Sequence, residues 1–324
     1  MSDDPTLFNF RTVRNTAEQL RAAVEALSRG ELIILPTETV YGLACDASDA
    51  NAVARVFEAK GRPRFNPLIS HVPDIAAAET VVRLDAKGRA LAERFWPGPL
   101  TIVAPAQLDA PVSDLARAGL DSIAVRAPAG AAAQAVLRMF GRPVAAPSAN
   151  KSGRPSPTCL ADAVSETGAS AAVALDGGRC AVGLESTVVS VLDGEVRLLR
   201  PGGVSRAELQ AIVGSLATDA GEEGHRSPGR LARHYAPQTP VRLGADQPEV
   251  GEAFLAFGPG APEGPEVWNL SPAGDLREAA ANLFAYLRLA DAAGMRTIAV
   301  APIPERDLGE AINDRLRRAA GFVG

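Results

Sequence analysis

The stretch Leu32-Ile-Ile-Leu-Pro-Thr-Glu-Thr-Val-Tyr-Gly-Leu43 joins a short apolar run to a polar loop that contains glycine. The run Leu32 to Leu35 has the length and composition of a buried strand, and Pro36 ends it. Apolar residues then recur at helical spacing as far as Lys60, so residues 37–48 are expected to connect this strand to a helix. In α/β sheets such loops present ligand-binding groups. An ordinary polar turn would have the same composition.

Working outward, apolar periodicity predicts helices that alternate with buried strands, as in an α/β sheet. A capping-box pattern at Thr16 and Gln19 opens the first helix, and a second at Ser205 and Glu208 opens a short helix to about Val213. The Asp193-Gly194 pair favours a type I′ hairpin, so the sheet is expected to be mixed. The remaining expected helices are Leu84 to Phe95 and Ala131 to Phe140. The expected strands are Leu68 to Val72, Leu100 to Ala104, Ile123 to Val125, Val144 to Ala146, Ala171 to Leu175, Thr187 to Leu192 and Glu195 to Leu199.

With 324 residues, the chain exceeds the usual size of one hydrophobic core. Periodicity lapses into glycine, proline and acids at 215–240, which is the composition of a linker. We therefore expect a catalytic domain at 1–214 and a smaller α/β domain at 241–324. The elements expected in the smaller domain are strands at Val241 to Leu243, Ala253 to Phe257, Val267 to Leu270 and Thr297 to Ala301, with helices from Leu276 and from Leu308 to Leu316.

Composition narrows the class of partner and the compartment. The net charge of -5 argues against a broad nucleic-acid surface, so small anions are the expected partners. Cys45, Cys159 and Cys180 form no CxxC pair, which indicates neither a disulfide framework nor a zinc site. No apolar stretch approaches the length of a membrane helix, and residues 1–10 contain no signal-peptide core. A cytoplasmic protein without a membrane partner is expected.

Three further segments have the composition of ligand-binding loops. Lys60-Gly-Arg-Pro-Arg64 places three cations around Gly61 and Pro63, which end a helix, and fixed cations suit phosphate or carboxylate groups. Residues 147–158 combine small hydroxyl and amide side chains after a strand. Residues 183–189 lead into the hairpin that returns to Arg200. Each segment could instead be a solvated loop or a satisfied part of the core.

Motifs that are absent exclude several common scaffolds. The sequence contains no GxxxxGK[ST] phosphate loop, no strand-linked GxGxxG and neither HExxH nor GxSxG. The three histidines, His71, His225 and His234, are too far apart in the sequence to predict a metal site from spacing. A nucleotide would therefore be bound by another kind of fold.

Taken in order, these segments resemble the YrdC-like family. The resemblance rests on PTETVYGL at 36–43, KGRPRFNPLISH at 60–71, FWPGPLT at 95–101, PSANKSGRPSPT at 147–158, ESTVV at 185–189 and RPG at 200–202. It covers nearly all of residues 20–205. The segment SPGRLARHYAP at 227–237, with a domain after it, further resembles the longer, two-domain threonylcarbamoyl-AMP synthases.

The resemblance implies a twisted mixed sheet with a deep cleft and a smaller Rossmann-like C-terminal domain. It also implies synthesis of threonylcarbamoyl-AMP from L-threonine, bicarbonate and ATP, with Mg2+ on the phosphates and pyrophosphate released. The product would pass to the tRNA threonylcarbamoyl transferase machinery. The positions that match those holding threonine are Thr39, His71, Arg126, Ser148 and Ser186. Those that match ATP-holding positions are Arg62, Asn66, Ser122, Asn150, Thr158, Arg200 and Tyr235.

Lys60 matches a lysine in the cleft of the family. Lys60 and Arg62 are the candidate catalytic residues, and no metal ligand is assigned. The linker around Tyr235 is expected to close over bound ATP as a lid. The sequence departs from the family pattern at two places. It has Ala44-Cys45 where Gly-Ala is usual, and Arg230-Leu-Ala232 where Met-Lys-Tyr is usual. The first is expected to pack in the core, and the second leaves the linker contacts open.

Three other functions compete with the synthase. An RNA-binding module is one, because YrdC-like domains are also associated with RNA, although the acidic total and the lack of an aromatic-basic patch count against it. A carbamoyltransferase is another, but its relatives contain zinc-type cysteine pairs that this sequence lacks. A hydrolase using Ser148 or Ser186 with His71 is the third, and no nucleophile-elbow spacing supports it.

Overall fold

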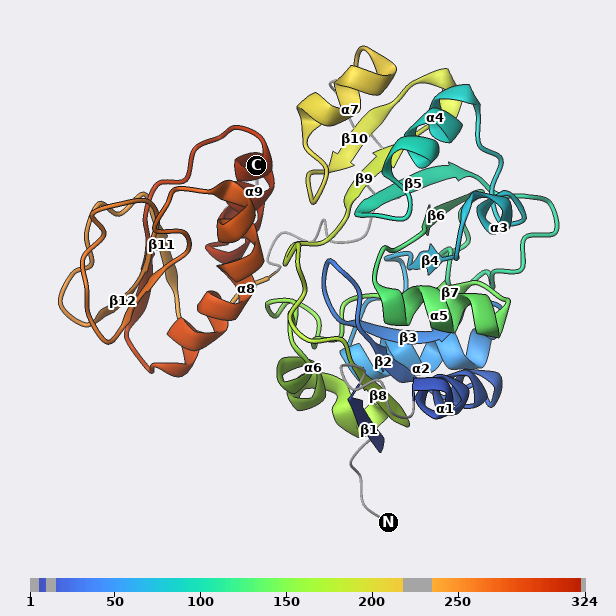
Figure 1. Cartoon of the computed structure of the whole chain (residues 1–324), viewed down its shortest axis with the longest axis horizontal. Coiled ribbons are helices and arrows are strands. Elements are labelled where there is room, and N and C mark those ends of the chain that lie inside the picture. Colours follow the sequence, from blue (N-terminus) through green and yellow to red (C-terminus); the bar gives the residue numbers. More distant parts are fainter. Residues whose placement is uncertain (1–5, 10–15, 218–234, 322–324) are drawn as a thin grey trace.

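The computed structural model describes residues 6–9, 16–217 and 235–321. Within these residues the chain forms a ten-stranded mixed sheet and a separate four-stranded parallel sheet. We call the large sheet with its helices the first unit and the small sheet with its helices the second unit. Figure 1 shows the two units side by side, with helices α8 and α9 of the second unit turned toward the first.

The large sheet has the order β1-β8-β2-β3-β7-β4-β6-β5-β9-β10. Its strands are β1 Thr6–Asn9, β2 Ile33–Leu35, β3 Gly42–Asp46, β4 Ile69–His71, β5 Leu100–Pro105, β6 Ser122–Arg126, β7 Val144–Ala145, β8 Val173–Asp176, β9 Thr187–Ser190 and β10 Arg197–Arg200. The helices of this unit are α1 Thr16–Ser28, α2 Ala50–Lys60, α3 Ile75–Glu79, α4 Ala86–Phe95, α5 Ala131–Phe140, α6 Leu160–Thr167 and α7 Arg206–Val213.

Both faces of the large sheet are buried, which explains why its strands are apolar at successive positions. In β2, Ile33 and Leu35 face a core formed with α1 and α5, whereas Ile34 faces a second core formed with α2 and α4. The unusual Ala44-Cys45 pair divides in the same way, with Ala44 in the first core and Cys45 in the second. The expectation that this pair packs is therefore confirmed.

The mixed α/β sheet and the expected strands are confirmed, with two local corrections. Residues 37–48 do not simply connect a strand to a helix, because they contain β3, which pairs antiparallel with β2. The hairpin turn is longer than expected: Asp193 and Gly194 both have positive φ, at 57° and 74°, but six residues separate β9 from β10. Two positive φ values fit these turn residues, and Ser190 and Arg197 at the strand ends remain directly paired across the longer loop.

The capping box expected at α7 forms, whereas the one expected at α1 cannot be checked. Ser205 and Glu208 form the expected capping box of α7. At the first helix, α1 already begins at Thr16, and the contacts of that side chain lie outside the described residues. The structure also adds strand β1 and helices α3 and α6, which the sequence analysis did not predict.

The second unit is a parallel sheet in the order β11-β14-β12-β13, as expected for a Rossmann-like unit. Helices α8 and α9 cover one of its faces, where their apolar side chains pack on Leu255 and Val300. The other face packs through Phe254 and Ala299 against the loop at Ala261. Its elements are β11 Val241–Leu243, β12 Glu252–Ala256, β13 Val267–Asn269, α8 Leu276–Ala292, β14 Thr297–Val300 and α9 Leu308–Ala319.

The two units share a packed interface. Val40 and Leu184 of the first unit belong to the same apolar cluster as the buried side chains of α8 and α9. Gly183 lies so close to α8 that an added Cβ would come within 2.4 Å of the Cα of Ala281. This close approach brings the loop before β9 directly against α8 (Figure 1). Among the described residues, no helix is long and apolar enough to cross a membrane.

Candidate functional site

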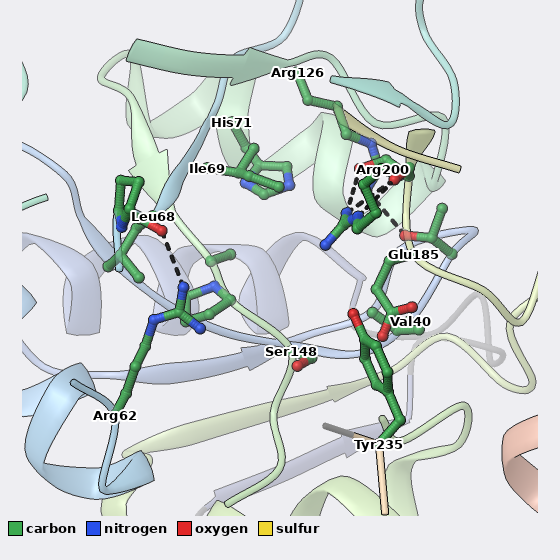
Figure 2. A pocket seen from close by; sticks show the side chains of 15 residues that line it. Val40, Arg62, Leu68, Ile69, His71, Arg126, Ser148, Glu185, Arg200 and Tyr235 are labelled. Carbon is green, nitrogen blue, oxygen red and sulfur yellow. Dashed lines mark hydrogen bonds between the residues drawn. The ribbon is translucent and has the colours of Figure 1, made fainter. Parts of the chain in front are cut away.

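A cavity opens at the strand ends of the first unit, with about 500 Å³ of space free of atoms when the open solvent at its mouth is included. Figure 2 shows side chains from distant parts of the chain that point into it. Eight of the residues selected from the sequence line this cavity: Thr39, Arg62, His71, Arg126, Ser148, Ser186, Arg200 and Tyr235. The structure therefore brings together residues from the threonine set and from the ATP set.

The end of α2 places Arg62 at the rim of the cavity. Gly61 ends the helix with φ 60° in the left-handed region, and the backbone N–H of Arg62 donates to the carbonyl of Phe57 at 2.9 Å. The Arg62 guanidinium donates to the carbonyl of Pro67 at 3.0 Å (Figure 2). Desolvation lowers the pKa of Arg62 to about 10, so the side chain remains a cation at neutral pH.

Arg126, at the end of β6, is held by three acceptors. Its Nη2 lies 2.6 Å from Glu38 Oε1, its Nη1 donates to Thr39 Oγ1 at 2.9 Å, and its Nε donates to the carbonyl of Gly98 at 3.1 Å. Only 4% of the Arg126 side chain is exposed, so this ion pair is shielded from solvent. Glu38, which sequence reasoning did not select, therefore fixes a candidate threonine-binding cation.

His71, at the end of β4, faces the cavity beside Ile69 (Figure 2). Burial, reinforced by the charge of Arg126, lowers the pKa of His71 to about 3. The imidazole is consequently neutral at physiological pH. A neutral ring with so low a pKa is suited to orienting a ligand by hydrogen bonding and is a weak proton acceptor.

Arg200, at the end of β10, is oriented by Ser186. Its Nη2 donates to the carbonyl of Ser186 at 2.8 Å and to Ser186 Oγ at 3.2 Å. The Ser186 hydroxyl also shares a hydrogen bond of 2.7 Å with Thr101. Burial lowers the pKa of Arg200. These contacts leave Ser186 in a network with no histidine, which does not support a Ser/His nucleophile.

Five selected residues do not line the cavity but lie buried close to its loops: Lys60, Asn66, Ser122, Asn150 and Thr158. The amino group of Lys60 donates to the carbonyls of Ser148, at 2.5 Å, and Asn150. The carbonyl of Asn66 accepts from Arg62 at 3.3 Å. Ser122 Oγ, Asn150 Oδ1 and Thr158 Oγ1 are buried and have no hydrogen-bond partner among the described residues. Such atoms are rare in folded proteins, and a bound ligand or an ordered water would satisfy them.

Besides Glu38, sequence reasoning missed two further charged residues beside the cavity. Glu185 lines it, accepts from the Ser156 hydroxyl and pairs with Arg315 Nε at 2.8 Å. Glu185 lay inside a motif already selected, so its position could have been noticed. Arg315 belongs to α9 of the second unit, and nothing in the local sequence indicates that it reaches the first unit.

Comparisons with known proteins identify the family to which the chain belongs. A family model described as "Telomere recombination", which joins Sua5, YciO and YrdC proteins, matches residues 25–202, and one described as "Threonylcarbamoyl-AMP synthase, C-terminal domain" matches residues 204–321. The threonylcarbamoyl-AMP synthase of Pyrococcus abyssi is 37% identical and covers 96% of this chain and 97% of its own length. The synthase of Bacillus subtilis is 36% identical and covers 94% and 93%.

Solved structures give the same result. The crystal structure of P. abyssi Sua5 complexed with L-threonine matches with a TM-score of 0.88 at 35% identity, covering 98% of this chain and 97% of that chain. The Escherichia coli YciO structure, at 20% identity and a TM-score of 0.53, covers 61% of this chain and shares the fold alone.

Proposed function

The chain belongs to the threonylcarbamoyl-AMP synthase family, and from this membership we propose that it makes threonylcarbamoyl-AMP from L-threonine, bicarbonate and ATP. The observation that carries the proposal is the convergence in one cavity of Arg62, Arg126 and Arg200 with Thr39 and Ser186. These cations and hydroxyls suit the carboxylate of threonine and the phosphates of ATP. A relative matched over 97% of its own chain is described as complexed with L-threonine.

Two sets of residues divide the work in this proposal. Thr39, His71, Arg126, Ser148 and Ser186 hold L-threonine; Arg62, Asn66, Ser122, Asn150, Thr158, Arg200 and Tyr235 hold ATP. Support for the second set comes from the buried hydroxyl and amide oxygens of Ser122, Asn150 and Thr158, which have no partner among the described residues. Bound ATP would satisfy them. Lys60 supports the loop between both sets through its bonds to Ser148 and Asn150.

The reaction needs positioning more than covalent chemistry by the protein. The amine of threonine attacks the carbon of bicarbonate or CO2 to form a carbamate, with water lost when bicarbonate reacts and a proton released from the nitrogen to solvent when CO2 reacts. A carbamate oxygen then attacks the α-phosphorus of ATP, and the bond to the leaving pyrophosphate breaks. Arg62 and Arg200 stabilise the charge on the phosphates, while Arg126 and Thr39 orient threonine.

We further propose that Mg2+ accompanies the phosphates of ATP. Among the described residues, no group of three or more His, Cys, Asp or Glu side chains comes together to hold a metal, and Mg2+ is commonly held through substrate phosphates. The proposed division is a catalytic domain at 1–214, a linker at 215–240 and a C-terminal domain at 241–324. The setting is cytoplasmic, and the product passes to the tRNA threonylcarbamoyl transferase machinery. Direct tRNA binding is not part of the proposal, because Arg62, Arg126 and Arg200 face a cavity.

One incubation tests substrate, reaction and product together. The protein is mixed with ATP, Mg2+, L-threonine and 14C-bicarbonate, and the product is separated and identified by mass. A labelled threonylcarbamoyl adenylate that requires all three substrates supports the proposal. A protein that shifts tRNA on a gel in a salt-dependent way but forms no such product would support the RNA-binding alternative.

A further inference from the structure

Arg315 of α9 is a buried cation that reaches from the second unit into the first. It has no exposed surface, and its Nε donates to Glu185 Oε2 at 2.8 Å while its Nη2 donates to the carbonyl of Pro201 at 3.0 Å. Its Nη1 lies 2.5 Å from Asp314 Oδ2 on the same helix. The guanidinium carbon also lies 5.0 Å from the centre of the Tyr235 ring.

Each of these contacts from outside α9 lines the cavity or is adjacent in sequence to a residue that does. Glu185 and Tyr235 line it directly, and Pro201 follows the cavity residue Arg200 in sequence. Figure 2 shows Glu185, Arg200 and Tyr235 grouped on one side of the cavity. Arg315 therefore lies behind the wall of the candidate site and holds three of its segments together.

The charge of Glu185 is the reason that this contact matters. Its carboxylate is the one acidic group lining the cavity among the described residues, and 9% of its side chain is exposed. Without a counter-ion, it would repel the anionic substrates and attract Arg200, which is electrostatically coupled to it. Although desolvation opposes it, attraction to Tyr235, Glu185 and Asp314 raises the pKa of Arg315, so this cation persists at neutral pH.

We propose that Arg315 is a positioning residue for the synthase reaction, which neutralises Glu185 from the second unit and so keeps Arg200 available to the anionic substrates. The inference rests on the proposed function. It also gives the second unit a role in substrate binding, because the loop before β9 lies against α8 and its Glu185 is paired with α9.

The test compares Arg315→Met, Glu185→Gln, the double variant and wild type by the dependence of pyrophosphate release on ATP and threonine concentration. Arg315→Met should raise the KM for ATP by about tenfold, with a smaller fall in kcat, because a buried charge loses its partner. Adding Glu185→Gln to Arg315→Met removes that charge and should return KM to within about threefold of wild type. The matched control is Arg317→Met on the same helix, whose side chain is exposed and pairs with Glu305.

Thermal unfolding measures whether Arg315→Met is folded at the assay temperature, so that a rise in KM can be told apart from a loss of folded protein. If Arg315→Met does not fold, Arg315→Lys retains the charge and should keep the KM for ATP near that of wild type. The inference is overturned if Arg315→Met has an unchanged KM, if Glu185→Gln fails to rescue it, or if the lysine variant folds with a KM at least tenfold above that of wild type. A wild-type protein without synthase activity would contradict the proposed function instead.

Discussion

The side-chain nitrogen of Lys60 lies 2.5 Å from the carbonyl oxygen of Ser148, although the two residues are 88 positions apart in the sequence. The same nitrogen also donates to the carbonyl of Asn150. One amino group at the end of α2 therefore fixes the backbone of a loop whose side chains are candidates for both substrates. Burial, with the repulsion of Arg62, lowers the pKa of Lys60 well below its usual value. Even a neutral amine has two N–H donors for these carbonyls.

Lys60→Met should impair the loop as well as the chemistry. Two carbonyls would lose their donor, at about 1–3 kcal/mol each, so the free energy of unfolding should fall by about 2–6 kcal/mol. Turnover should fall by more than tenfold, because Ser148 and Asn150 lose their position. The control is Lys87→Met, since Lys87 is exposed and contacts only the carbonyl of Gly194 in the described structure. Equal stability and turnover in both variants would remove Lys60 from the site.

Arg62→Ala should raise the KM for ATP strongly, and Arg62→Lys should restore little. The Nε and Nη2 atoms of the guanidinium donate to the carbonyls of Asn66 and Pro67. These two bonds fix the plane of the guanidinium at the cavity wall. A lysine offers a point charge without this fork. Steady-state kinetics with varied ATP measure the effect, and Arg138→Ala on the exposed side of α5 serves as control. Near wild-type kinetics for both Arg62 variants would place this residue outside the nucleotide site.

His71 should make the folded protein less stable in acid. Its pKa is about 3 in the folded state, whereas an unfolded histidine has a pKa of about 6.5. As the pH falls through this window the unfolded chain binds a proton that the folded chain does not, so the free energy of unfolding decreases. His71→Gln should lose less stability than wild type between pH 7.5 and pH 5 in urea titrations. An identical decline in both proteins would show that His71 is not held neutral.

Tyr235 should contribute to ATP binding as part of a lid. Tyr235 is 1% exposed and lines the cavity, and the centre of its ring lies 5.5 Å from that of Phe284 in α8. Tyr235→Ala should raise the KM for ATP by about tenfold or more, because aromatic contact and exclusion of water are both lost. A chain truncated after Gly214 should fold, yet bind ATP more weakly and make less product. Full activity of the truncated chain would leave the linker as a tether.

Pyrophosphate release should require both L-threonine and bicarbonate. The proposed nucleophile is their carbamate. The site positions this carbamate, and not water, for attack on ATP. A coupled pyrophosphate assay, with each substrate omitted in turn and CO2 removed from the buffers, measures this dependence. Rapid cleavage of ATP in the absence of threonine would contradict the mechanism.

Periodicity and short motifs were sufficient for most of the fold. Strand β4 and helix α5 lie where their apolar patterns predict, and the capping box at Ser205 forms as expected. Strand β3 was missed because its sequence, Gly-Leu-Ala-Cys-Asp, contains no β-branched or aromatic residue and so lacks the composition typical of a strand. Its pairing with β2 became visible only in the structure.

The sequence by itself determined the mixed α/β class and the loops from which the candidate site is built, since strand ends, glycine turns and clustered cations are local properties. The tertiary structure decided which of these residues meet. Glu38 contacts Arg126, which is 88 residues away in the sequence, and Arg315 contacts Glu185, which is 130 residues away. No periodic or local pattern in the sequence indicates either contact. Such ion pairs depend on how the strands are ordered and how α9 packs against the first unit, which are collective properties of the fold.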